Sequence, residues 1–118
     1  MKDLDPTFAA LSKVLRKHTA DMSIRTDELG HLYVELPPAA PGGKPRFFGA
    51  VQTKRAYVSY HLMPVYEDPM LLDGIGDALR RRMQGKSCFN FTEADPQLVR
   101  ELDTLTRACA CASQTCRK

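Results

Sequence analysis

Apolar residues recur with the 3.6-residue period of a helix in three segments, and each segment opens with an Asp-Pro dipeptide, at residues 5–6, 68–69 and 95–96. The aspartate carboxylate can accept hydrogen bonds from free N–H groups of the first turn, and proline at the first helical position has no N–H to leave unsatisfied. The pattern therefore predicts three helices. Gly74 and Gly76 interrupt the middle stripe, so we expect that helix to break or to consist of two short helices.

Between the first two helical segments the hydrophobic period changes to two, as in β-strands. Residues 31–36 alternate strictly, and residues 46–52 and 56–63 are rich in aromatic and β-branched side chains. A strand near Ile24 precedes a turn at residues 27–30, and residues 53–55 predict a tight connection. After the middle helix, residues 87–91 predict one more strand.

The order of these elements predicts an α+β fold, with helix, strands, helix, strand and helix following one another. Because strands joined by short turns pair antiparallel, we expect an antiparallel sheet of about four or five strands with helices packed on one face. A chain of 118 residues fits a single domain, residues 1–118. We expect the residues after about 107 to fray as a tail.

The charge balance argues against a highly charged partner. The 17 Lys and Arg residues exceed the 14 Asp and Glu residues by three, and the basic residues are spread along the chain. We therefore expect no nucleic-acid partner, although weak, salt-sensitive binding through residues 80–82 stays open. No apolar run reaches the roughly 18 residues of a membrane span. The N-terminus carries acids where a signal peptide has basic and apolar residues, so we expect a cytoplasmic protein with free thiols and no membrane partner.

Gly85-Lys86-Ser87 matches the last three residues of a nucleotide-binding P-loop. The motif requires a first glycine where this chain has Arg80. It also requires a helix after the loop, so that the helix N-terminus faces the phosphate, whereas here a helix precedes the loop and a strand follows it. We therefore exclude a P-loop and interpret Gly85 as the glycine that ends the middle helix.

The cysteines offer an alternative chemistry. Cys109, Cys111 and Cys116 form a Cys-x-Cys-x₄-Cys cluster and are the candidate metal ligands. The spacing lacks the second Cys or His pair of a zinc site, so we predict no resident cofactor, with iron or zinc as the alternative. Cys88 lies in the last predicted strand, and we expect it in the core.

One face of the strand at residues 56–63 carries candidate binding groups. Tyr57, Ser59 and His61 share that face by the two-residue period, and Phe47 or Phe48 would join them from the neighbouring strand. Such a face can be a small-molecule cleft or a partner surface. The other interpretation is an ordinary solvent-facing surface of a one-sided sheet.

The run from Phe48 to Phe91 resembles the small bacterial YdhG-like family of domains of unknown function. The similar features are a strand of the "GAV" kind, an aromatic strand ending in Pro64, a Leu-rich helix, a Gly-Lys-Ser turn and a short strand with two phenylalanines. The resemblance implies a compact α+β domain. Because some members are described as frataxin-like iron chaperones, it also implies iron handling as a function to test. The acids of this chain are scattered and form no acidic ridge, so no metal ligand is carried over.

We therefore predict a non-enzymatic module, without catalytic residues, that binds a small molecule or a protein on the open face of the sheet. The candidate ligand-binding residues are Tyr57, Ser59, His61, Tyr66, Lys86 and Asn90. The alternatives are frataxin-like metal handling and an enzyme that uses His61 near hydroxyl groups. The sequence leaves open whether the protein is a monomer or a homodimer, and which face of the strand the helices cover.

Overall fold

The computed structural model describes residues 4–20, 22–37 and 41–113 of the chain. Helices and strands follow one another in the order α1 (Asp5–Lys17), β1 (Ser23–Glu28), β2 (His31–Leu36), β3 (Arg46–Thr53), β4 (Val58–Leu62), α2 (Met63–Glu67), η1 (Pro69–Gly74), α3 (Asp77–Arg80), β5 (Met83–Gln84), β6 (Cys88–Phe91) and α4 (Pro96–Ser113), where η1 is a 3₁₀ helix. The predicted α+β class is confirmed.

Within these described residues, six strands form one antiparallel sheet in the order β1-β2-β3-β4-β6-β5. The sheet exceeds the expected four or five strands because β5 is a two-residue strand that the hydrophobic pattern cannot reveal. Gly85 has a φ of +84° in the turn between β5 and β6. Our interpretation of Gly85 as the end of a helix was therefore wrong: it supplies the left-handed backbone of a strand connection.

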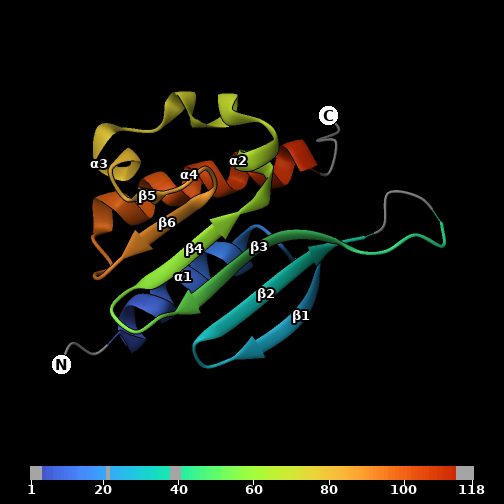
Figure 1. Cartoon of the computed structure of the whole chain (residues 1–118), viewed down its shortest axis with the longest axis horizontal. Coiled ribbons are helices and arrows are strands. Elements are labelled where there is room, and N and C mark those ends of the chain that lie inside the picture. Colours follow the sequence, from blue (N-terminus) through green and yellow to red (C-terminus); the bar gives the residue numbers. More distant parts are fainter. Residues whose placement is uncertain (1–3, 21, 38–40, 114–118) are drawn as a thin grey trace.

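Figure 1 shows α1 and α4 on one side of the sheet, with the opposite face left open. Helix α1 packs on β3 and β4, and it also contacts α4. The helix-covered face supplies the core, in which alternate residues of the strands are buried: Leu32, Val34, Val51, Val58, Tyr60, Leu62, Phe89 and Phe91. The helices therefore cover the face of Val58, Tyr60 and Leu62, and Ser59 and His61 lie on the open face.

Two of the three Asp-Pro dipeptides act as predicted. Asp95 accepts a hydrogen bond from the backbone N–H of Gln97 at 2.9 Å at the start of α4, and Asp68 accepts one from Met70 at 3.3 Å at the start of η1. Asp5 is different, because α1 already begins there and Leu4 occupies the capping position. An acidic residue in the first turn still favours the helix through its dipole.

The segment between β4 and β5 is a chain of short helices that packs against α4. The expected interruption near Gly74 and Gly76 is confirmed, because η1 ends at Gly74 and α3 begins at Asp77. The strand predicted to reach residue 63 ends at Leu62, and the five-residue helix α2 begins at Met63. Proline fits the first turn of α2, where its missing N–H costs nothing.

Strand β3 contains a bulge beside β2. The register shifts between Val34 and Glu35, and Phe48 is left without a partner on β2. The extra residue places Phe48 in the core and its neighbour Phe47 on the open face. A single strand therefore supplies one phenylalanine to each side of the sheet.

Gly49, next to the bulge, lies where α1 approaches the sheet. A Cβ atom at this position would lie 2.8 Å from the carbonyl oxygen of His61 and 3.4 Å from Cδ1 of Leu15. Because the first contact is with backbone, a side chain there would separate strands or displace the helix.

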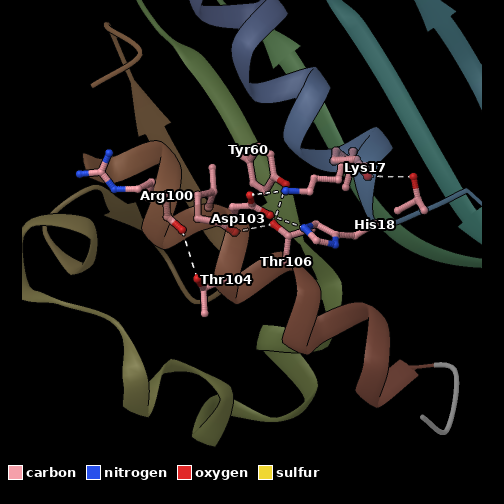
Figure 2. A network of polar contacts seen from close by, with 10 residues as sticks. Lys17, His18, Tyr60, Arg100, Asp103, Thr104 and Thr106 are labelled. Atoms are coloured by element: carbon pink, nitrogen blue, oxygen red, sulfur yellow. Dashed lines mark hydrogen bonds and ion pairs between the residues drawn. The ribbon is translucent and has the colours of Figure 1, made fainter. Parts of the chain in front are cut away.

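Polar contacts join α1 to α4 and α4 to the sheet (Figure 2). Asp103 of α4 forms an ion pair with Lys17, at 3.0 Å, and a hydrogen bond with the imidazole of His18 at the end of α1. Deeper in, the hydroxyl groups of Tyr60 and Thr106 lie 2.7 Å apart. These contacts hold both long helices on the same face of the sheet.

Helix α4 continues past residue 107, where we expected fraying, as far as Ser113. Its inner residues from the second half, Cys109 and Ala110, belong to the core. No helix in the described part of the chain is both long enough and apolar enough to cross a membrane.

Candidate functional site

The open face of the sheet carries two adjacent rows of side chains in register across β2, β3, β4 and β6. The first row consists of Tyr33, Ala50, His61 and Cys88. The second row consists of His31, Gln52, Ser59 and Asn90. Every member of the second row can form hydrogen bonds, whereas the first row places a small alanine between two rings.

Aromatic rings of residues in and beside the first row form a continuous array. The Phe47 ring lies 4.8 Å from the Tyr33 ring and 4.9 Å from the His61 imidazole, measured between centroids. Tyr33 continues the array to His31 at 6.3 Å. The rings come from three neighbouring strands, and separations of this size are typical of attractive aromatic pairs.

A hollow of about 480 Å³ lies over this part of the sheet. Ala50 is its floor, because the residues that pair with it on either side, Tyr33 and His61, are much larger. The lining residues are Tyr33, Phe47, Ala50, Gln52, Lys54, Ser59, His61 and Cys88. A volume of this size, with apolar walls and a few polar groups, is typical of small-molecule sites.

Burial favours the neutral form of two titratable groups inside the hollow, His61 and Cys88. Burial lowers the pKa of His61 below its ordinary 6.5, which favours the uncharged imidazole at neutral pH. Burial also raises the pKa of Cys88, against hydrogen bonds from Ser87 and Ser59 and the charge of Lys54, which lower it. Cys88 is therefore a thiol and not a thiolate under the same conditions.

Lys54 supplies the positive charge of the hollow, at the end of β3 where the chain turns into β4. The backbone N–H of Lys54 donates to the carbonyl oxygen of Tyr57 at 2.7 Å, which fixes this turn as predicted. Glu35 is the cross-strand partner of Phe47, and its carboxylate forms an ion pair with the guanidinium of Arg25, with 3.6 Å between the nitrogen and the oxygen. No carboxylate is among the eight residues that the structure places around the hollow.

The six predicted ligand-binding residues do not all meet. Ser59 and His61 line the hollow, and Asn90 is the cross-strand partner of Ser59. Tyr57 belongs to the turn before β4. The remaining pair, Tyr66 of α2 and Lys86, form their own contact, with the ammonium 6.0 Å from the ring centroid.

Five lining residues were missed by the sequence reasoning: Tyr33, Ala50, Gln52, Lys54 and Cys88. The alternation of residues 31–36 and 88–91 could have placed Tyr33 and Cys88 on the open face. Their neighbours Leu32 and Phe89 are strongly apolar and therefore belong to the core face. Cys88 is half-buried on the open face, so our expectation that it lies in the core was wrong. Gln52 lies beside Ser59 because β3 and β4 pair in this register, and the residue pattern of one strand does not indicate its register with another.

The candidate metal ligands at the end of α4 have separate roles. Cys109 is buried in the core, and burial raises its pKa to about 12. Cys111 is disulfide-bonded, which contradicts our expectation of four free thiols, and Cys116 lies outside the described residues. Among the described residues no group of three or more His, Cys, Asp or Glu side chains is placed to hold a metal ion.

A second hollow, of about 520 Å³, shares Phe47 with the first and lies beside α2. Its walls include Arg46, Glu67 and Asp68, and therefore carry charges of both signs. Asp68 is already engaged as the cap of η1. We consider the hollow over Ala50 the better candidate, because the aromatic array and the polar row meet there.

No family model, curated protein or solved structure matches the chain. The resemblance to the YdhG-like family therefore stays a prediction.

Proposed function

We propose that the protein is a binding module that takes a small, flat molecule into the hollow on the open face of its sheet. The observation that carries the proposal is the row in which Ala50 lies between Tyr33 and His61, with Phe47 closing one side. Flat ligands gain most from such a site, because ring faces and edges offer contact area at little conformational cost.

The chemistry of the lining favours binding over catalysis. A nucleophilic cysteine requires a lowered pKa, whereas burial raises that of Cys88. His61 packs against the Phe47 ring and is held neutral by burial. Gln52 donates from its amide to Nε2 of His31 at 2.9 Å, so one polar group of the second row is already oriented. These groups are suited to position a ligand.

The test is a screen of small aromatic compounds by ¹H–¹⁵N NMR on the full-length protein, repeated with Ala50→Leu. A leucine side chain would occupy the floor of the hollow. Compounds that shift the amide resonances of Gln52, Ser59 and Cys88 in the wild type should lose that effect in the variant. His61→Ala is the second variant, because it removes a wall and leaves the floor intact.

Urea denaturation and sedimentation of both variants provide the controls. Unchanged unfolding midpoints and mass would attribute the lost binding to the hollow itself. The proposal fails if compounds bind Ala50→Leu as tightly as the wild type, or if they shift resonances elsewhere. It also fails if the wild type is a dimer that His61→Ala converts to a monomer, because the open face is then an interface between copies.

A further inference from the structure

The hollow on the open face is apolar at one end of β3 and polar at the other. Phe47 lies at one end, Ala50 forms the floor, and Gln52 and Lys54 follow toward the turn. From Ala50 to Lys54 is four residues, or about 13 Å along an extended strand. The lysine side chain spans part of this distance, so its ammonium is within reach of a group attached to a ring that rests on Ala50.

The positive charge of Lys54 acts on groups across the floor of the hollow. It lowers the pKa of Cys88, a residue two strands away from β3, and therefore acts across the site. The thiol and the imidazole that line the same hollow are neutral at pH 7, so they do not offset the ammonium. Glu35, the cross-strand partner of Phe47, is neutralised by its ion pair with Arg25 at 3.6 Å.

The polar row beside Lys54 adds hydrogen-bond donors at the same end. Gln52, which pairs with Ser59 across β3 and β4, has two amide hydrogens, and only one of them is donated to Nε2 of His31. An amide N–H and an ammonium together are typical partners of a carboxylate or a phosphate, because both donate toward negative oxygen. A cationic ligand would find no acidic partner among the eight described lining residues.

We propose that the ligand is a planar aromatic or heteroaromatic molecule carrying one anionic group, with its ring over Ala50 against Phe47 and His61 and its anionic group toward Lys54 and Gln52. This inference rests on the proposed function of the same hollow. It adds the orientation and the charge of the ligand.

The experiment compares three probes of one shape on the full-length protein: 2-naphthoate, 2-naphthamide and 2-naphthylmethylamine. Dissociation constants come from ¹H–¹⁵N NMR titration at pH 7.5 and low salt, read from the amides of Gln52, Ser59 and Cys88. Because Lys54 is exposed, we expect 2-naphthoate to bind roughly two- to fivefold more tightly than the neutral amide, the range of an exposed ion pair. The amine should bind most weakly.

Lys54→Gln should remove the preference for 2-naphthoate over 2-naphthamide. The matched control is Lys13→Gln, which removes an equal charge from an exposed position of α1, on the other side of the sheet. Equal affinities for the three probes, or a preference that survives Lys54→Gln, would overturn the inference and leave the proposed function standing. If no probe shifts the resonances of the hollow, both the inference and the proposed function are overturned.

Discussion

The hydroxyl oxygens of Tyr60 and Thr106 lie 2.7 Å apart at a fully buried contact between β4 and α4. Thr106 also donates to the carbonyl oxygen of Leu102 at 2.7 Å. A threonine hydroxyl has one hydrogen, so Tyr60 is the donor of the pair. Burial raises the pKa of Tyr60, which keeps that hydrogen in place. The pair thus orients the sheet and the helix by a single directed bond.

Removal of the Tyr60 hydroxyl by Tyr60→Phe should lower the free energy of unfolding by about 1 kcal/mol, because one buried hydrogen bond is lost. Thr106→Val should cost more, about 2 kcal/mol, because it leaves a buried donor without an acceptor. The double variant should cost less than the sum of the two. Urea denaturation measures all three, and strict additivity would show that the two hydroxyl groups are not coupled.

Substitution of Gly49 tests the close approach of α1 to the sheet. Gly49→Ala should destabilise the protein by roughly 1–3 kcal/mol, because the new methyl group meets the backbone oxygen of His61. Gly74→Ala is the matched control, since nothing lies within 4 Å of its Cβ position, and we expect a change within about 0.5 kcal/mol. Similar thermal unfolding of the two variants would contradict the packing described for Gly49.

The polar contacts of Asp103 with Lys17 and His18 predict a pH dependence of stability. Burial acts to raise the pKa of Asp103, but hydrogen bonds from His18 and Lys17 outweigh it, so the pKa lies below 3.8. A lowered pKa in the folded state stabilises the protein above the pKa of the unfolded state, and this contribution disappears as the pH falls through the lower value.

The difference in unfolding free energy between wild type and Asp103→Asn should therefore shrink from about pH 5 downward. Urea denaturation at several pH values between 5 and 2.5 measures it. Asp73→Asn removes an exposed carboxylate of η1 and serves as the control. A difference that stays constant, or grows with acid, would contradict the assignment.

The imidazole of His61 should titrate below its ordinary pKa of 6.5, because burial is the cause of the shift. Phe47→Ala removes the ring that packs against it at 4.9 Å and should raise the pKa toward 6.5. The ring ¹³C–¹H signal followed by NMR across pH 4–9 reports both values. An unshifted pKa in the wild type would mean that water reaches the hollow freely.

The thiol of Cys88 should react slowly with iodoacetamide at neutral pH, because burial raises its pKa. Lys54→Gln should slow it further, since the charge of Lys54 lowers that pKa. Peptide mapping by mass spectrometry separates Cys88 from the other cysteines. Acceleration by Lys54→Gln, or equal slowing by Lys13→Gln, would place the lysine charge elsewhere.

The sequence predicted those parts of the fold that depend on local periodicity and capping. The alternation of residues 31–36 coincides with β2, and the Asp95 cap begins α4 as expected. Prediction ended where local signals are weak: β5 has two residues, and α2 continues directly from a strand whose pattern runs on through Met63.

The site was predicted less completely because it depends on how strands align. Ser59 and His61 could be assigned to one face from their own strand, and the structure places both in the hollow. Whether Phe47 or Phe48 joins them depends on a bulge that arises from pairing with β2. Lys54 lies beside the hollow only because the turn between β3 and β4 folds back on itself.

The bulge in β3 has a consequence for natural and engineered variation. Phe48 is buried and supports the core, whereas Phe47 lies on the opposite surface. Substitutions at adjacent codons should therefore produce different phenotypes. Cellular abundance should fall for most replacements of Phe48. It should hold for replacements of Phe47, which under the proposed function would change ligand selectivity instead. Two neighbouring positions of one strand can thus vary almost independently, because one supports folding and the other lies on the open face.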